Sequence, residues 1–252
     1  MIYRKHFKQA LSAVLVLYLL HAPQLWPNEW KRVYLATFPR SGNHWTRFII
    51  EEATHIATSS VYPDWTPEYQ HLRTPFPWGG YCCAYGYQGN CRYPTRDDIV
   101  VIKTHYPSLS KTAFDCAPHV KTIRIVRNPI DSFYSFYVFS HRGNPPEKMI
   151  PSSFVKKYIK SFSRFHDYYN SKAGVETFRY EDLLENPIPV FSQIFNNIGY
   201  FVREADIQRA VARYPPKGRL FKHIDRYQKR DIELIKSELG DFLEQFDYQI
   251  PN

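Results

Sequence analysis

The segment 37–45 contains the residue types of an anion-binding turn. It consists of Thr-Phe-Pro-Arg-Ser-Gly-Asn-His-Trp and directly follows a short apolar run. Gly42 permits close approach of the backbone to a ligand, Arg40 supplies a fixed positive charge, and Ser41 supplies a hydroxyl donor. A helix that begins after the glycine would direct free N–H groups at the same anion. The spacing therefore predicts a phosphate cradle between a strand and a helix.

This turn differs from the phosphate loop of nucleotide triphosphatases. That loop requires a lysine and then a Ser or Thr directly after its last glycine. Here the cation, Arg40, precedes Gly42, and no Ser or Thr occupies the magnesium position after it. A kinase with a degenerate loop stays open only as an alternative.

A second candidate anion site comes after the β-branched run 122–126. Arg127 ends this run, and Ser135 lies eight residues later, inside the helix that Pro129 is suited to begin. A guanidinium and a hydroxyl brought together at the edge of a sheet can hold a phosphate. Asp131 is interpreted as a helix-terminal or turn residue and not as a catalytic acid.

Between these two motifs lies a candidate proton acceptor. The apolar run 99–102 ends in Lys103-Thr-His105. A neutral imidazole can accept a proton from a reacting hydroxyl. Lys103 and Arg40 would offset negative charge that develops during a transfer.

In this order the motifs resemble those of the PAPS-dependent sulfotransferase superfamily, over about residues 33–248. The resemblance implies that His105 is the general base, with Lys103 and Arg40 as catalytic cations near the transferring group. Arg40 stands where the family commonly has lysine, a change that keeps the charge but alters reach and donor geometry. The residues implied to hold the 5′-phosphosulfate end and the adenine are Arg40, Ser41, Gly42, Asn43, His44 and Trp45.

The resemblance also assigns the other end of the nucleotide. Arg127 and Ser135 would hold the 3′-phosphate, and Tyr180 would contact adenine. Glu181 and Asp182 would cap the following helix. A late basic loop, in which the order of residues differs from that of the family, would add Lys217, Gly218 and Arg219. PAPS would be the donor substrate and PAP the product, with no metal and no covalent intermediate.

The elements that must position these residues alternate along the chain. Strands are expected at 33–38, 99–102, 122–126 and 175–178, and helices at 44–56, 131–140, 154–170, 187–197, 206–213 and 230–246. The alternation predicts one α/β domain with a central parallel sheet flanked by helices, and the resemblance makes this a P-loop-like sulfotransferase fold. Ligands of such sheets bind beyond the carboxyl ends of the strands.

The N-terminal segment 1–30 is treated separately from the domain expected at 31–252. Three basic residues precede the apolar run 10–20, and Pro23 interrupts the segment beyond it. A basic flank before an apolar run suits a signal anchor, but this run is short for a membrane span and normal for a secretory signal or a buried helix. A cytoplasmic location and a membrane-associated or secretory one therefore both stay open.

The segment 59–98 is rich in Pro, Gly, Tyr and Trp, and its apolar residues follow neither the helical nor the strand periodicity. It is expected to be an irregular loop, either an acceptor-binding lid or a self-packed segment. The four cysteines are Cys82, Cys83, Cys91 and Cys116. They could pair in an oxidising compartment or stay reduced, and their spacing is not that of a zinc site.

Composition limits the partners without choosing one. Lys and Arg outnumber Asp and Glu by 33 to 24, and the net charge of +9 favours polyanions. The expected acceptor is a hydroxyl on a glycan, a glycolipid, a tyrosine or a small molecule, and nucleic acid is not expected. The alternatives are a nucleotide-binding pseudoenzyme and a basic module that binds anions or glycans.

Overall fold

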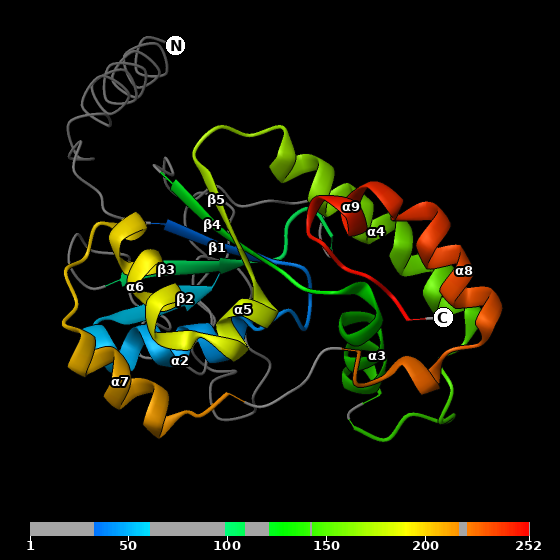
Figure 1. Cartoon of the computed structure of the whole chain (residues 1–252), viewed down its shortest axis with the longest axis horizontal. Coiled ribbons are helices and arrows are strands. Elements are labelled where there is room, and N and C mark those ends of the chain that lie inside the picture. The colour runs from blue at the N-terminus through cyan, green and yellow to red at the C-terminus, as the bar shows by residue number, and fades with distance from the viewer. Residues whose placement is uncertain (1–32, 61–98, 109–120, 142, 217–220, 252) are drawn as a thin grey trace, which may run out of the picture. The chain divides into compact units, whose positions relative to one another are not determined.

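The core of the protein is a five-stranded parallel sheet with the strand order β2-β3-β1-β4-β5 (Figure 1). The structure is a computed structural model that describes residues 33–60, 99–108, 121–141, 143–216 and 221–251. The strands are β1 (Val33–Thr37), β2 (Ala57–Ser60), β3 (Ile99–Thr104), β4 (Lys121–Val126) and β5 (Val175–Arg179). All four neighbouring pairs are parallel, which confirms the predicted α/β class.

Helices cover both faces of this sheet. They are α2 (Asn43–Thr54), α3 (Pro129–Ser140), α4 (Ser152–Asn170), α5 (Tyr180–Glu185), α6 (Pro187–Ile198), α7 (Glu204–Arg213), α8 (Lys229–Glu238) and α9 (Gly240–Gln245), with a 3-10 turn at Ile224–Arg226. Figure 1 shows α2, α6 and α7 on one side of the strands and α3, α4, α8 and α9 on the other. The described elements belong to one unit, Arg32–Asn252.

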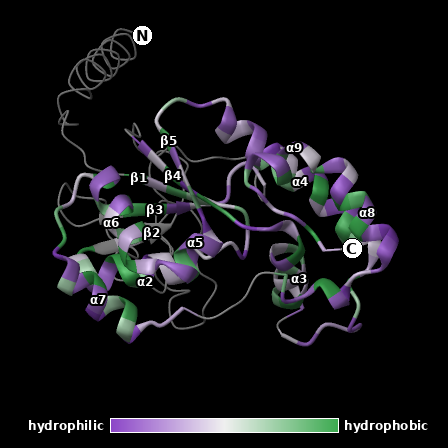
Figure 2. Cartoon of the chain, viewed as in Figure 1, coloured by the Kyte–Doolittle hydropathy of each residue, from purple (hydrophilic) through white to green (hydrophobic). Residues whose placement is uncertain are grey.

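Neighbouring residues of a strand supply the two cores, because side chains alternate between the faces of a sheet. Leu35 packs with α2 and α6, whereas Ala36 packs with α3 and α4. On β4, Ile125 belongs to the same core as Leu35, and Val126 belongs to the same core as Ala36. The helices that cover the sheet are amphipathic, and Figure 2 shows hydrophobic and hydrophilic residues alternating along α4 and α8.

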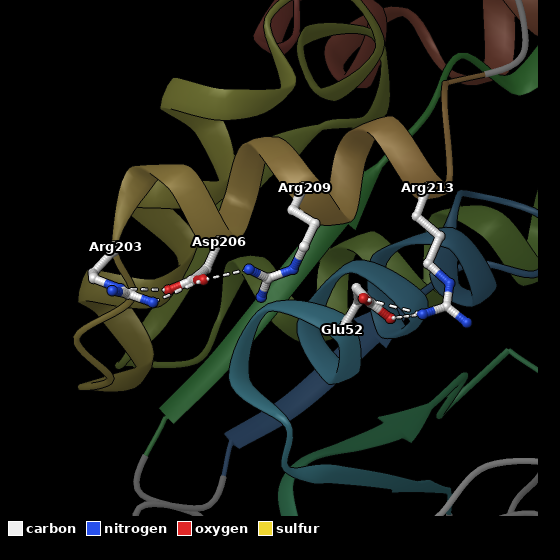
Figure 3. A network of polar contacts seen from close by, with 5 residues as sticks. All are labelled: Glu52, Arg203, Asp206, Arg209 and Arg213. Atoms are coloured by element: carbon white, nitrogen blue, oxygen red, sulfur yellow. Dashed lines mark hydrogen bonds and ion pairs between the residues drawn. The ribbon is translucent and has the colours of Figure 1, made fainter.

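One of the surface ion pairs in Figure 3 joins α7 to α2. Arg213 Nη1 lies 3.0 Å from Glu52 Oε2 on α2. Asp206 of α7 pairs with Arg203, which precedes the helix, and with Arg209, each at 2.8 Å. Surface ion pairs of this kind are screened by solvent and contribute little to stability. They lie on the helix that ends beside Tyr214, whose carbonyl accepts a hydrogen bond from Trp45.

Several predicted boundaries are wrong for identifiable reasons. The segment expected to be irregular from residue 59 begins inside β2, a four-residue strand at the sheet edge whose short Ala-Thr-Ser-Ser sequence gives little periodic signal. The helix expected over 230–246 breaks at Leu239, which ends α8 and precedes α9, with φ −118° and ψ 21°. The short helix α5 was not predicted.

Some predictions fall on residues outside the described ranges. They concern the N-terminal segment 1–30, the loop 61–98, all four cysteines, and Lys217, Gly218 and Arg219. These stay predictions. None of the helices that the structure describes is long and apolar enough to cross a membrane.

Candidate active site

The three motifs meet because their strands are neighbours. β1 lies between β3 and β4, and all three strands run parallel. The segments after these strands, which begin at Phe38, His105 and Arg127, therefore emerge at the same edge of the sheet. This is the edge at which parallel α/β sheets bind ligands.

The turn between β1 and α2 has the geometry of an anion cradle. Arg40 and Gly42 both adopt left-handed backbone conformations, with φ of 66° and 90°. The first turn of α2 contains no acidic residue of its own. The Ser41 hydroxyl is buried and has no hydrogen-bond partner among the described residues. Because buried polar groups are nearly always paired, this orphan hydroxyl marks a place for a ligand oxygen.

Tyr180 lies directly against this turn. A Cβ built on Gly42 would overlap the Cδ2 and Cε2 atoms of the Tyr180 ring. The guanidinium carbon of Arg127 lies 4.7 Å from the centre of the same ring, and Trp45 meets it edge-on at 6.3 Å. The Trp45 indole N–H donates to the Tyr214 carbonyl at 2.7 Å, which fixes the indole beside the end of α7.

The second predicted anion site is continuous with the first. Arg127 Nη1 donates to the carbonyl oxygen of Arg40 at 2.7 Å, and Arg40 Nε donates to Ser135 Oγ at 3.2 Å. Burial, and then the charge of Arg127, lowers the pKa of Arg40. No ion pair joins either guanidinium to a carboxylate among the described residues, and Arg127 Nε is buried without a hydrogen-bond partner there. Two cations held together in this way favour an anion with more than one charged group.

A buried polar network supports the turn after Arg127. Asn128 Oδ1 accepts from the Asp131 N–H at 2.8 Å, and Asn128 Nδ2 donates to Glu181 Oε1 at 2.8 Å. The Tyr248 hydroxyl donates to the other Glu181 oxygen at 2.5 Å. Asp131 is thus a helix-terminal residue, as predicted. The Asp131 carboxylate oxygen Oδ1 accepts a hydrogen bond from the His223 N–H at 3.1 Å.

The capping role predicted for Glu181 and Asp182 is wrong. Both residues lie in the first turn of α5 itself. Glu181 bridges Asn128 and Tyr248, and Asp182 lies 3.6 Å from Arg179. The next helix, α6, begins after Asn186 without any side-chain cap.

The structure determines which nitrogen of His105 carries a proton. Nδ1 lies 2.7 Å from the Thr37 carbonyl oxygen, which can only accept, so Nδ1 is the protonated nitrogen and Nε2 the basic one. Burial, and next the charge of Lys103, hold the pKa of His105 well below its ordinary value. The imidazole is therefore neutral at physiological pH and chemically able to accept a proton at Nε2.

Two predicted phosphate ligands differ in how they can act. The Asn43 side chain turns inward, and its Nδ2 donates to Thr37 Oγ1 at 3.3 Å, so a contact with an anion would come from its backbone N–H. On α2, desolvation and then the charges of Lys103, Arg47 and Arg40 lower the pKa of His44 to about 3. His44 is therefore a neutral hydrogen-bonding residue in a positive field.

The structure thus brings together every predicted site residue that it describes. Sequence reasoning missed Thr37, which orients His105, and Phe139, whose ring lies 5.1 Å from the Arg40 guanidinium. It also missed Tyr248. Phe139 lies one helical turn after Ser135, a spacing that could have indicated it. No local signal connects Tyr248 to Glu181, which lies 67 residues away.

A known protein family matches the part of the chain that contains most of these elements. Residues 31–214 match the sulfotransferase domain family. The chain belongs to this family.

Individual relatives match this chain only in part. Human Sulfotransferase 6B1 is 28% identical over 192 residues, which cover 70% of this chain and 57% of that protein. A WSCD family member of Drosophila melanogaster is 35% identical over 95 residues, covering 38% of this chain and 23% of the relative. The chain therefore spans less than two thirds of the length of these relatives.

Solved sulfotransferase structures confirm the fold. A mouse sulfotransferase in complex with PAP superimposes with a TM-score of 0.54 at 15% identity, over 88% of this chain and 90% of that one. A retinol dehydratase in complex with androsterone and PAP gives a TM-score of 0.52 at 17% identity, over 90% and 84%. At these identities the likeness concerns the fold alone.

Proposed function

We propose that the protein transfers a sulfuryl group from PAPS to a hydroxyl acceptor, with His105 as general base. The observation that carries the proposal is the juxtaposition of unsatisfied anion-binding groups with a neutral, oriented imidazole. Ser41 Oγ and Arg127 Nε are buried without described partners, and His105 lies at the neighbouring strand end. The solved relatives that contain PAP support this choice of nucleotide.

The residues of the cradle fit the two charged ends of PAPS. The N–H groups at the start of α2 and the Ser41 hydroxyl would hold the 5′-phosphate. Arg127 and Ser135 would hold the 3′-phosphate, with the Arg127 guanidinium kept in place by the Arg40 carbonyl and the Tyr180 ring. Trp45 and Tyr180 offer aromatic surface for the adenine.

The transfer needs one proton acceptor and two cations. The acceptor oxygen attacks sulfur while its proton moves to His105 Nε2, and the bond between sulfur and the bridging phosphate oxygen breaks. The electron pair of that bond leaves on the 5′-phosphate of PAP, which gains negative charge. Arg40 and Lys103 offset this charge as it develops. His105 then releases its proton to solvent.

Thr37 prepares His105 for this step. Its carbonyl accepts the Nδ1 proton at 2.7 Å, so the basic lone pair is on Nε2 before any substrate binds. The Thr37 hydroxyl, 3.2 Å from Nδ1, is held in turn by Asn43. A fixed tautomer and ring orientation reduce the entropy that must be lost at the transition state.

Donor binding is the first test of this proposal. Calorimetry would compare PAP with AMP, which lacks the 3′-phosphate, on the natural chain and on Arg127→Met. We expect the natural chain to prefer PAP by at least about tenfold, because one charge-assisted contact contributes about 1.5–3 kcal/mol. Arg127→Met should remove most of that preference and leave AMP binding nearly unchanged. Equal affinity of the natural chain for both nucleotides would contradict the assignment of Arg127.

A further inference from the structure

A cavity lies on α4, beside the two residues that follow the proposed base. It has a volume of about 650 Å³, within the range of sites for small molecules. Its wall contains Tyr106 and Pro107, the two residues directly after His105, and one side of α4. We call this cavity the α4 groove. The proposed transfer chemistry uses none of its side chains.

Hydrogen bonds connect the backbone of His105 to α4, which forms one wall of the groove. The Ser108 N–H donates to the His105 carbonyl at 2.8 Å, and Ser161 on α4 donates to the Ser108 carbonyl at 2.7 Å. The Tyr106 ring meets Tyr168 of α4 edge-to-face, with centroids 5.0 Å apart. These contacts fix the wall of the α4 groove relative to the His105 backbone, because Tyr106 and Pro107 directly follow His105 in the chain.

The side chains of the α4 groove combine aromatic rings with charges of both signs. Lys160 and Arg164 supply cationic donors, and Asp167 and Glu238 supply anionic acceptors. Tyr106 and Tyr168 supply rings. A purely apolar acceptor would desolvate these charges without replacing their hydrogen bonds. A polyanion would meet the two carboxylates, whose charge opposes its binding.

A sugar matches this combination. Its hydroxyl groups both donate and accept hydrogen bonds, which suits neighbouring ammonium, guanidinium and carboxylate groups. Its C–H faces carry slight positive charge and pack against the negative faces of aromatic rings. We propose that the α4 groove binds sugar units of a glycan acceptor next to the unit that is sulfated. This inference rests on the proposed function, which it deepens by naming the acceptor class.

Exposed residues of the α4 groove permit a test that should not disturb the core. Arg164→Ala and Asp167→Asn change side chains at the surface of α4. Arg209→Ala is the matched control, because Arg209 is an exposed arginine that pairs with Asp206 on α7, outside the groove. The probes are fluorescently labelled maltotetraose, an N-acetyllactosamine tetrasaccharide and chitotetraose, all three of them uncharged sugars. Their binding to the full chain is measured with and without saturating PAP, and PAP affinity is measured in the same samples.

We expect at least one of these tetrasaccharides to bind the natural chain. Its affinity should fall at least about fivefold in Arg164→Ala and in Asp167→Asn and stay unchanged in Arg209→Ala. Binding of none of the three probes, or equal binding by all the chains, would overturn the inference. Oligosaccharide binding with this pattern in a chain that does not bind PAP would refute the donor site and leave the groove assignment standing.

Discussion

The close packing of Gly42 against Tyr180 makes one substitution especially informative. Gly42→Ala would place a methyl group in steric overlap with Cδ2 of the Tyr180 ring, at a residue with φ of 90°. The substitution therefore strains the backbone and also displaces the ring. Gly199 provides the matched control. Its φ is 77°, and no described atom lies within 4 Å of a Cβ built there, so Gly199→Ala carries the backbone cost alone.

The magnitudes of the two effects can be separated. A left-handed backbone costs an alanine about 1–2 kcal/mol. Forcing the packed ring aside adds about 1–3 kcal/mol. Tyr180 also supports the Arg127 guanidinium at 4.7 Å, so its displacement should weaken PAP binding by about tenfold.

Urea denaturation and PAP calorimetry on the two variants test this reasoning. We expect Gly42→Ala to lower the free energy of unfolding by about 2–5 kcal/mol and Gly199→Ala by about 1–2 kcal/mol. Only Gly42→Ala should lose PAP affinity. Adding Tyr180→Ala removes the overlap, so the combined loss of stability should fall short of the sum by about 1 kcal/mol or more. A cost for Gly42→Ala no greater than that for Gly199→Ala, or equal PAP affinity in the two variants, would refute the reasoning.

Two further predictions concern stability. His166 is buried among phenylalanines, neither ring nitrogen has a described partner, and burial holds its pKa well below the ordinary value. The unfolded chain binds the proton first, so the stability from neutral His166 is present above about pH 6.5 and lost below it, by up to about 1.4 kcal/mol per pH unit. The free energy of unfolding, measured by urea denaturation from pH 7 to pH 5, should therefore fall less steeply with pH in His166→Phe than in the natural chain, by up to about 1.4 kcal/mol per pH unit. The same pH dependence in both chains would contradict a buried, neutral His166. Tyr248→Phe removes the hydroxyl that donates to Glu181 and should cost about 1–3 kcal/mol, whereas Tyr134→Phe, which loses an exposed contact with the Lys148 carbonyl, should cost less than about 0.5 kcal/mol. Equal losses in the two tyrosine variants, measured by urea denaturation, would argue against the buried network.

Much of the site was predictable because its signals are local. The apolar run before Thr37, the glycine at the turn and the helical pattern after it occupy adjacent positions. The same holds for the β-branched run that ends at Arg127. Parallel strands then bring their carboxyl ends to one edge, so the meeting of the motifs results from the fold class.

The remaining features depend on contacts between distant residues. The tautomer of His105 is set by the Thr37 carbonyl, which lies 68 residues earlier. Glu181 has the spacing of a helix-capping residue, but its partners in the turn after β4 and near the C-terminus determine a bridging role. The short strand β2 is stabilised by pairing with β3, and its own residues carry too little pattern to reveal it.

Transfer of labelled sulfate from PAPS to a panel of hydroxyl acceptors tests the central claim most directly. The panel should include the three tetrasaccharides, a phenol and a steroid alcohol. The natural chain would be compared with His105→Ala, with PAP binding measured in the same samples. We predict transfer by the natural chain and a loss of at least about a hundredfold in His105→Ala, with PAP affinity retained. Full activity in His105→Ala, or failure of the natural chain to bind PAP, would contradict the account.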